Sequence, residues 1–132
     1  MLIILDTNVL ASGLLKGNSN SGLIMRLIVN GRLRLAYDFR IIDEYREVLI
    51  RPKFKFRREN IDSILKVIET EGVLMQTKPI DITLEDPGDR PFIEVAAACK
   101  GAPLVTGNLK HYKACKDFDV ELVTPAELIS RL

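Results

Sequence analysis

Apolar residues along the chain follow two alternating patterns: short runs, and longer stretches with helical spacing. The short runs lie at residues 1–5, 33–37, 72–75, 104–106 and 120–123, and each is bounded by polar residues or glycine, which predicts strands. Between them, apolar positions recur every three or four residues and predict helices over 8–15, 23–28, 41–49, 61–68 and 92–99. The pattern is one of strands alternating with helices.

Helix boundaries are marked by residues with known positional preferences. Gly31, Gly72 and Gly101 follow predicted helices, and Pro52 closes another. The stretch 124–127, Thr-Pro-Ala-Glu, has the capping-box pattern of a final helix start. Strands that alternate with helices imply a mostly parallel sheet covered on both faces. We therefore expect an α/β three-layer sandwich of four or five strands flanked by helices, in one domain spanning 1–132.

Composition narrows the class of protein. The chain has 132 residues, 47% of them hydrophobic, and 19 Lys and Arg balance 18 Asp and Glu. This excludes a histone-like polycation, an acidic tail protein and a charge-driven disordered chain. No apolar run approaches the roughly 18 residues of a membrane span, and the run 1–5 ends at Asp6, too short for a secretory signal. Cys99 and Cys115 form no zinc pattern, so we expect a cytoplasmic protein with reduced thiols and no membrane partner.

Four polar residues are expected at one edge of the sheet. Asp6 follows the first strand directly, and Asn108 follows the strand at 104–106. Glu44 lies early in the helix after the second strand, and Asp89 lies at the start of the helix before 104–106. Ligands of parallel sheets bind at the carboxyl ends of the strands. Topology therefore predicts that these four side chains share one side of the molecule.

Helical periodicity separates these acids from their neighbours. At about 100° per residue, Glu44 falls on the margin of the apolar face, whereas Asp43 and Glu47 fall opposite to it. In the 92–99 helix, Glu94 points away from the apolar face, so we expect it to face solvent, and Asp89 projects onto the apolar side. Glu44 and Asp89 are therefore the acids expected to point inward.

Oxygen ligands gathered at a sheet edge suit Mg²⁺ or Mn²⁺, which would neutralise the clustered carboxylates. Such a site generates hydroxide and stabilises in-line phosphoryl transfer. A single Asp after a strand is as often a helix cap or turn residue. Shared placement of four such residues is harder to explain that way.

Four motifs extend over nearly the whole chain. They are Leu5-Asp6-Thr7-Asn8-Val9-Leu10, Asp43-Glu44-Tyr45-Arg46-Glu47-Val48-Leu49, Asp86-Pro87-Gly88-Asp89-Arg90-Pro91-Phe92 and Leu104-Val105-Thr106-Gly107-Asn108. In this order and spacing they resemble the PIN-domain family, close to its prokaryotic toxin group. The resemblance implies an endoribonuclease dependent on Mg²⁺ or Mn²⁺, often a homodimer and often the toxin that pairs with an antitoxin protein.

Carried over to this sequence, the resemblance makes Asp6, Glu44 and Asp89 the catalytic, metal-binding acids. The implied mechanism has a metal held by Asp6 and Asp89 activate a water that Glu44 helps to orient. Asn108 stands where many PIN domains have an acid and offers only a carbonyl oxygen, which weakens a second metal site. The supporting residues beside the site are Thr7, Asn8, Thr106 and Asp86, of which Asp86 is the candidate to compensate for the missing acid.

A basic segment at residues 51–58 carries five cations and no acid, interleaved with Phe54 and Phe56. Such a segment can bind phosphates and stack bases, or it can be a solvated loop whose phenylalanines turn into the core. Residues 81–94 are acidic, with five acids against Arg90. His111 is a surface or capping histidine in one interpretation and a general acid in another. The candidate RNA contacts are Arg51, Lys53, Lys55, Arg57, Arg58 and Lys110.

Two other functions remain open. A PIN module that binds RNA or a protein partner with little or no catalysis is favoured by Asn108. A phosphohydrolase or phospho-acceptor with Asp6 as nucleophile needs a lysine after a later strand, and Lys110 has that spacing.

Overall fold

The central element is a sheet of five parallel strands in the order β3-β2-β1-β4-β5. The structure, a computed structural model, describes the backbone of residues 1–132 and every side chain except those of Ala114 and Lys116. The strands are β1 (Leu2–Leu5), β2 (Arg34–Tyr37), β3 (Val73–Leu74), β4 (Leu104–Val105) and β5 (Leu122–Val123). The α/β sandwich predicted from the sequence is confirmed, and all five predicted strands form.

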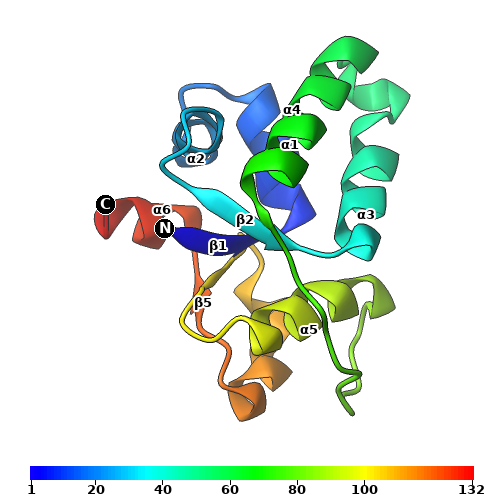
Figure 1. Cartoon of the computed structure of the whole chain (residues 1–132), viewed down its shortest axis with the longest axis vertical. Coiled ribbons are helices and arrows are strands. Elements are labelled where there is room, and N and C mark those ends of the chain that lie inside the picture. The colour runs from blue at the N-terminus through cyan, green and yellow to red at the C-terminus, as the bar shows by residue number, and fades with distance from the viewer.

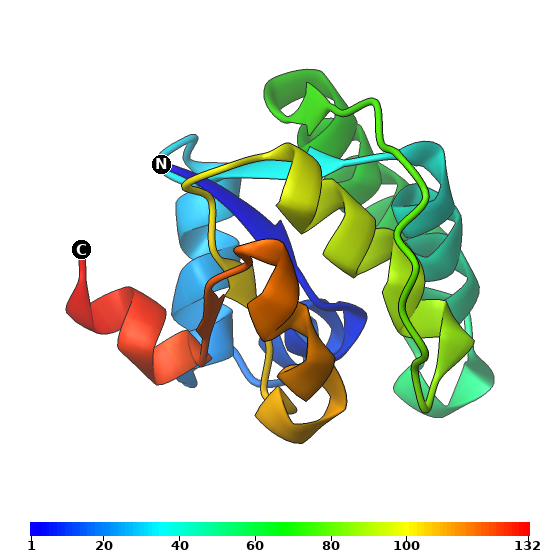
Figure 2. The same cartoon turned by 90° about the horizontal axis from the view of Figure 1, so that it is seen from below.

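Helices cover both faces of this sheet. Figure 1 shows α1 (Thr7–Leu15), α2 (Asn20–Val29), α3 (Phe39–Leu49) and α4 (Arg58–Glu71) on one side and α5 (Arg90–Ala98) on the other. Seen from below in Figure 2, α5 lies beside η3 (Leu109–Phe118), which consists of two short 3-10 helices joined at a kink at Tyr112. The short 3-10 helices η1 (Pro52–Phe54) and η2 (Pro87–Asp89) and the final α6 (Pro125–Ser130) complete the elements. No described helix is long and apolar enough to cross a membrane.

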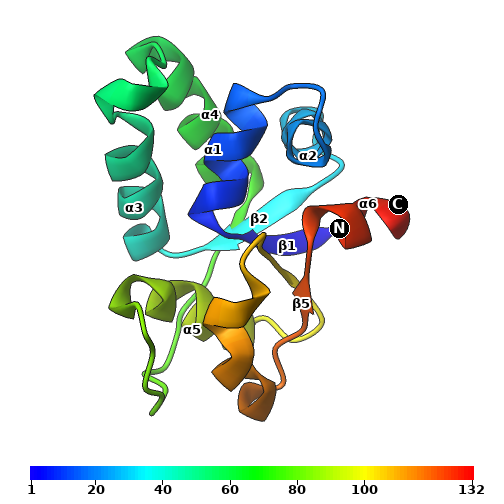
Figure 3. The ribbon, with the colours of Figure 1, turned by 180° about the vertical axis from the view of Figure 1, so that it is seen from behind.

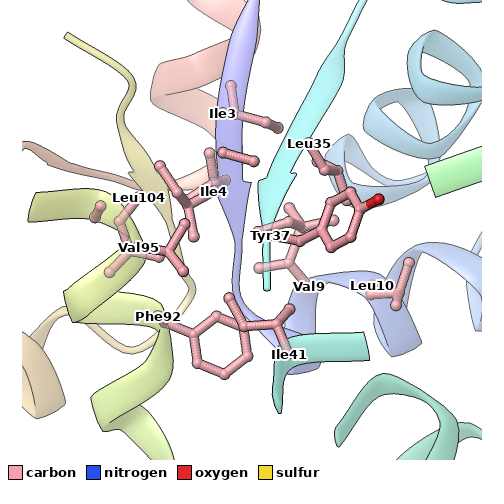
Figure 4. Packing of buried hydrophobic residues seen from close by; sticks show 14 of the residues in the cluster. Ile3, Ile4, Val9, Leu10, Leu35, Tyr37, Ile41, Phe92, Val95 and Leu104 are labelled. Carbon is pink, nitrogen blue, oxygen red and sulfur yellow. The ribbon is translucent and has the colours of Figure 1, made fainter. Parts of the chain in front are cut away.

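The core forms where β1 runs between the two helical layers. Ile3, Ile4 and Leu5 are fully buried, as expected for a central strand covered on both faces. Figure 4 shows Val95 and Leu104 beside Ile4. Near the carboxyl end of β1, the rings of Tyr45 in α3 and Phe92 in α5 lie 6.2 Å apart between centroids. The two helical layers therefore meet next to the end of β1.

Local capping explains where the elements depart from the predicted boundaries. α2 begins at Asn20, three residues before the predicted helix over 23–28, because the Ser19 hydroxyl accepts a hydrogen bond from the Gly22 backbone amide. α6 has the full capping box of Thr124 and Glu127 that the sequence predicted. η3 was not predicted, although Leu109, Tyr112, Cys115 and Phe118 recur every three residues, the period of a 3-10 helix.

The prediction that Glu94 faces solvent is wrong. Its side chain is only 4% exposed and lies 2.7 Å from Arg40 and 3.6 Å from Arg90. It also accepts a hydrogen bond from the Ile80 amide, while Arg90 donates to the Ile80 and Ile82 carbonyls. Glu94 is buried because these contacts fix the long loop after β3 against α5, and the loop covers the side chain. A helical projection of 92–99 contains no information about that loop.

In the basic segment, the two phenylalanines pack rather than stand free. The Phe54 and Phe56 rings stack on each other at 5.4 Å and lie half-buried against the core, with Lys53 over Phe54 at 5.0 Å. Lys55 between them has a positive φ of 56°, a left-handed conformation at the end of η1. The structure favours the interpretation in which these phenylalanines turn inward, whereas the five cations of the segment are exposed.

Candidate active site

Three acids from three separate elements approach one another at the carboxyl ends of the strands. Asp6 follows β1 and precedes α1, Glu44 lies in α3, and Asp89 lies between η2 and α5. Figure 3 shows the starts of α1, α3 and α5 near the ends of β1 and β2. We call Asp6, Glu44 and Asp89 the acid cluster. Asp6 is 6% exposed, and the Asp89 side chain is 14% exposed.

Each member of the acid cluster is held by a hydroxyl. Thr106, fully buried after β4, donates to Asp6 Oδ2 at 2.7 Å, and Tyr112 of η3 donates to Asp89 Oδ1 at 3.2 Å. Thr7, the first residue of α1, donates to Glu44 Oε2. Asp6 and Thr106 are 100 residues apart, so the pairing of β1 with β4 brings them together. The sheet register therefore fixes how the carboxylates are oriented.

Burial raises the pKa of all three carboxyls, and repulsion from neighbouring acids raises it further for Glu44 and Asp89. Burial is the largest cause for each. The charge of Asp6 then adds to the pKa of Glu44 and of Asp89, and Asp89 also raises that of Glu44. In the opposite direction, the hydroxyls of Thr106 and Thr7 lower the pKa of Asp6 and Glu44. The cluster thus concentrates negative charge that the protein only partly compensates.

Tyr45 and Gly88 fix the surroundings of Glu44. The Tyr45 hydroxyl, fully buried, donates to the Leu5 carbonyl at 2.5 Å and so ties α3 to the end of β1 next to Asp6. A Cβ at Gly88 would lie 3.3 Å from Glu44 Oε1 and 3.1 Å from Asp86 Oδ1, so a side chain there would crowd both acids. The absence of a side chain at position 88 lets η2 approach α3 closely.

The donor set fits a hard divalent cation in chemistry. Asp89 Oδ2 is buried and has no hydrogen-bond partner among the described atoms, an arrangement that costs free energy unless a cation or proton satisfies it. Carboxylate oxygens are the ligands that Mg²⁺ and Mn²⁺ prefer. Among the described residues, however, no three His, Cys, Asp or Glu side chains are arranged closely enough to form a ready-made metal centre.

The remaining predicted residues lie around the cluster with differing contacts. Asp86 Oδ1 accepts a hydrogen bond from the Gly88 backbone amide, and the charge of Asp86 raises the pKa of Glu44 and Asp89. The backbone N–H of Asn108 donates to Thr106 Oγ1 at 3.0 Å. The Thr106 hydroxyl therefore accepts a hydrogen bond from Asn108 while it donates one to Asp6. The side chains of Asn8 and Asn108 are exposed and make no hydrogen bond with the described part of the chain.

Tyr112 is the site residue that the sequence did not single out. It is fully buried, and its hydroxyl contacts Asp89 and lowers the pKa of both Asp89 and Asp6. Beside it, His111 Nδ1 lies 3.8 Å from Asp89 Oδ2. The available signal was the recurrence of Leu109, Tyr112, Cys115 and Phe118 every three residues, which places Tyr112 on the apolar face of a 3-10 helix.

The PIN-domain family model matches residues 2–110, a range that includes the whole acid cluster and Asn108. The chain belongs to the PIN-domain family. PIN domains are generally nucleases that act on RNA, and they usually use divalent metal ions. Within this PIN domain, Tyr112, most of η3, β5 and α6 lie beyond the matched range. No curated protein and no solved structure matches the chain.

Proposed function

We propose that this protein is a metal-dependent endoribonuclease that hydrolyses RNA phosphodiester bonds with Mg²⁺ or Mn²⁺. The observation that carries the proposal is the acid cluster: three carboxyls with raised pKa at one sheet edge, one of which has a buried oxygen without a hydrogen-bond partner among the described atoms. A protein that only bound RNA would gain nothing from concentrating negative charge there, because the charge repels phosphate. A cation turns the same charge into a binding site.

Each acid has a distinct role in the proposal. Asp6 and Asp89 hold the cation, and Glu44 completes the ligand set or orients the attacking water. When bound, the cation supplies an activated water and screens the scissile phosphate from the carboxylates. Thr106, Thr7 and Tyr112 keep the carboxylates oriented through the hydroxyl bonds described above.

Asn108 and Asp86 complete the site in this proposal. Asn108 contributes a carbonyl oxygen in place of a fourth acid, from an exposed side chain. Asp86 adds charge to the same region but keeps one oxygen on the Gly88 amide, so it replaces the missing acid only partly. One tightly held cation, rather than two, is the arrangement that this ligand set favours.

RNA contacts are proposed at Lys110 and at the basic segment, whose five cations are exposed. Arg51 follows Glu44 by seven residues along α3 and its end, roughly 10 Å at the rise of a helix. The segment is therefore placed to contact a distant part of a bound strand and not the scissile phosphate. The finer role as a homodimeric toxin with an antitoxin partner is supported by the motif resemblance, and the cytoplasmic location by the two cysteines without a zinc pattern.

The second candidate is a PIN module that binds RNA or a protein with little catalysis. It is favoured by Asn108, which lacks the charge of an acid, and by the finding that the described residues form no ready-made metal centre. Both features predict a weakly held cation. Cleavage and binding assays distinguish the two functions.

The decisive experiment incubates the purified protein with single-stranded and structured RNA in Mn²⁺, Mg²⁺ or EDTA. Asp6→Asn removes a cluster carboxylate, and Asp43→Asn, an exposed acid on the other side of α3, is the matched control. We expect cleavage by the wild type and Asp43→Asn only with metal, and none by Asp6→Asn. Cleavage that persists in EDTA or in Asp6→Asn would refute a metal nuclease, and RNA binding without cleavage under any condition would favour the binding module.

A further inference from the structure

A hollow beside the acid cluster is lined by cationic side chains. It has a volume of about 210 Å³ and is lined by Thr83, Leu84, Glu85, Lys110, His111 and Lys113. The first three come from the long loop before η2, and the others come from η3. Glu85 is the single carboxylate of the lining, so the two lysines give the hollow a net positive charge.

The cations of this hollow are available to a ligand. In the described part of the chain, neither Lys110 nor Lys113 lies within 4.0 Å of a carboxylate. The arginines that flank Glu44 and Asp89 along the chain are already engaged. Arg40 pairs with Asp38 and Glu94, Arg46 pairs with Asp62, and Arg90 donates to two backbone carbonyls.

His111 links the hollow to the acid cluster. It lines the hollow, and its Nδ1 lies 3.8 Å from Asp89 Oδ2, the oxygen without a hydrogen-bond partner. A group bound in the hollow is therefore one side chain away from Asp89. The three carboxylates of the acid cluster repel an approaching polyanion, and the adjacent cations of the hollow attract it.

We infer that this hollow is a phosphate subsite, which binds the backbone phosphate of the nucleotide next to the scissile bond. The inference rests on the proposed ribonuclease function, since it takes the acid cluster as the place of cleavage. Lysine ammonium groups and the Thr83 hydroxyl are donors that suit phosphate oxygens. His111 and Lys113 lie outside the range matched by the family model, so the subsite is assigned from this chain alone.

The first test measures binding without catalysis. A fluorescent single-stranded RNA oligonucleotide is titrated with protein in EDTA at several salt concentrations, using wild type and the double variant Lys110→Gln, Lys113→Gln. The control is Lys66→Gln, Lys100→Gln, which removes the same charge from exposed positions on α4 and after α5. Losing one phosphate contact lowers the salt slope by about 0.7 and the affinity about fourfold at 0.15 M salt. The control pair should leave both unchanged.

The second test locates the phosphate. An oligonucleotide with one uncharged methylphosphonate linkage next to the cleaved bond should raise the KM of the wild type about fourfold, for the same lost contact. The double variant should show no further increase, because the same contact is already missing.

The outcomes separate the two proposals. An unchanged salt slope in the double variant, or no RNA binding by the wild type, overturns the subsite. A reduced slope in a protein that never cleaves RNA supports the subsite and overturns the nuclease. Additive effects of the linkage and the double variant overturn the assignment to the neighbouring phosphate.

Discussion

Replacing Thr106 with valine tests whether its hydroxyl holds Asp6 in place. Valine keeps the shape of this fully buried side chain and removes Oγ1. Two hydrogen bonds are lost: the 2.7 Å bond to Asp6 Oδ2 and the 3.0 Å bond from the backbone N–H of Asn108. A bond to a charged acceptor contributes about 1.5–3 kcal/mol, and the partly buried amide can turn to water, so we expect a loss of about 2–3 kcal/mol.

The loss should depend on pH in a direction fixed by the pKa of Asp6. That pKa is already raised above 3.8 in the folded protein, and without Thr106 it rises further because the hydroxyl lowers it. A carboxyl with a raised folded pKa binds more protons when folded, so stability falls as pH rises through that pKa. The deficit of Thr106→Val should therefore be largest at neutral pH and smaller in acid.

Thermal unfolding in EDTA measures this prediction. A loss of about 2–3 kcal/mol in a chain of this length lowers Tm by about 10 °C. Thr106→Ser, which keeps the hydroxyl and loses one methyl group, should cost only about 1 kcal/mol. If valine and serine variants unfold at the same temperature across the pH range, the hydroxyl does not hold Asp6 and the reasoning is wrong. In the same variants, Mn²⁺ should stabilise Thr106→Val only at higher pH than the wild type.

Three other substitutions test separate parts of the structure. Asp6→Asn should raise the Tm of the metal-free protein at neutral pH and abolish its stabilisation by Mn²⁺, which for the wild type is about 2.7 kcal/mol at 100 times Kd. Asp43→Asn should do neither, and calorimetry with and without metal measures both effects. Tyr45→Phe should cost about 1 kcal/mol in chemical denaturation, since it leaves a buried β1 carbonyl without its donor. Glu94→Gln should cost about 1–2 kcal/mol, reduced from the value of a fully buried pair because Arg40 is 44% exposed, and proteolysis of the loop after β3 should become faster.

Much of the fold could be predicted from the sequence because burial imposes periodicity. The run 1–5 predicted β1, which is buried on both faces, and the 41–49 pattern predicted α3. η3 was missed because Leu109, Tyr112, Cys115 and Phe118 repeat every three residues, the period of a 3-10 helix, and not at the α-helical spacing from which the other helices were predicted. Prediction succeeded where local pattern and tertiary burial agree.

The candidate site was predictable to the extent that topology determines it. Parallel strands end at one edge, which placed Asp6, Glu44 and Asp89 together. The hydroxyl partners depend on contacts across 23 to 100 residues, which no local pattern encodes. The prediction that Glu94 faces solvent failed for the same reason. A projection along one helix does not show that Arg40, on another helix, pairs with Glu94.

Hydrogen bonds from three hydroxyls stabilise the acid cluster in the folded protein without a cation. Each donor belongs to a different element from the acid it holds: α1 supports α3, the end of β4 supports the end of β1, and η3 supports the start of α5. The bonds offset part of the burial cost of the three carboxylates. A cation that binds the same carboxylate oxygens must compete with these bonds. Its affinity, and the pH at which it binds, should therefore be set as much by Thr7, Thr106 and Tyr112 as by the acids.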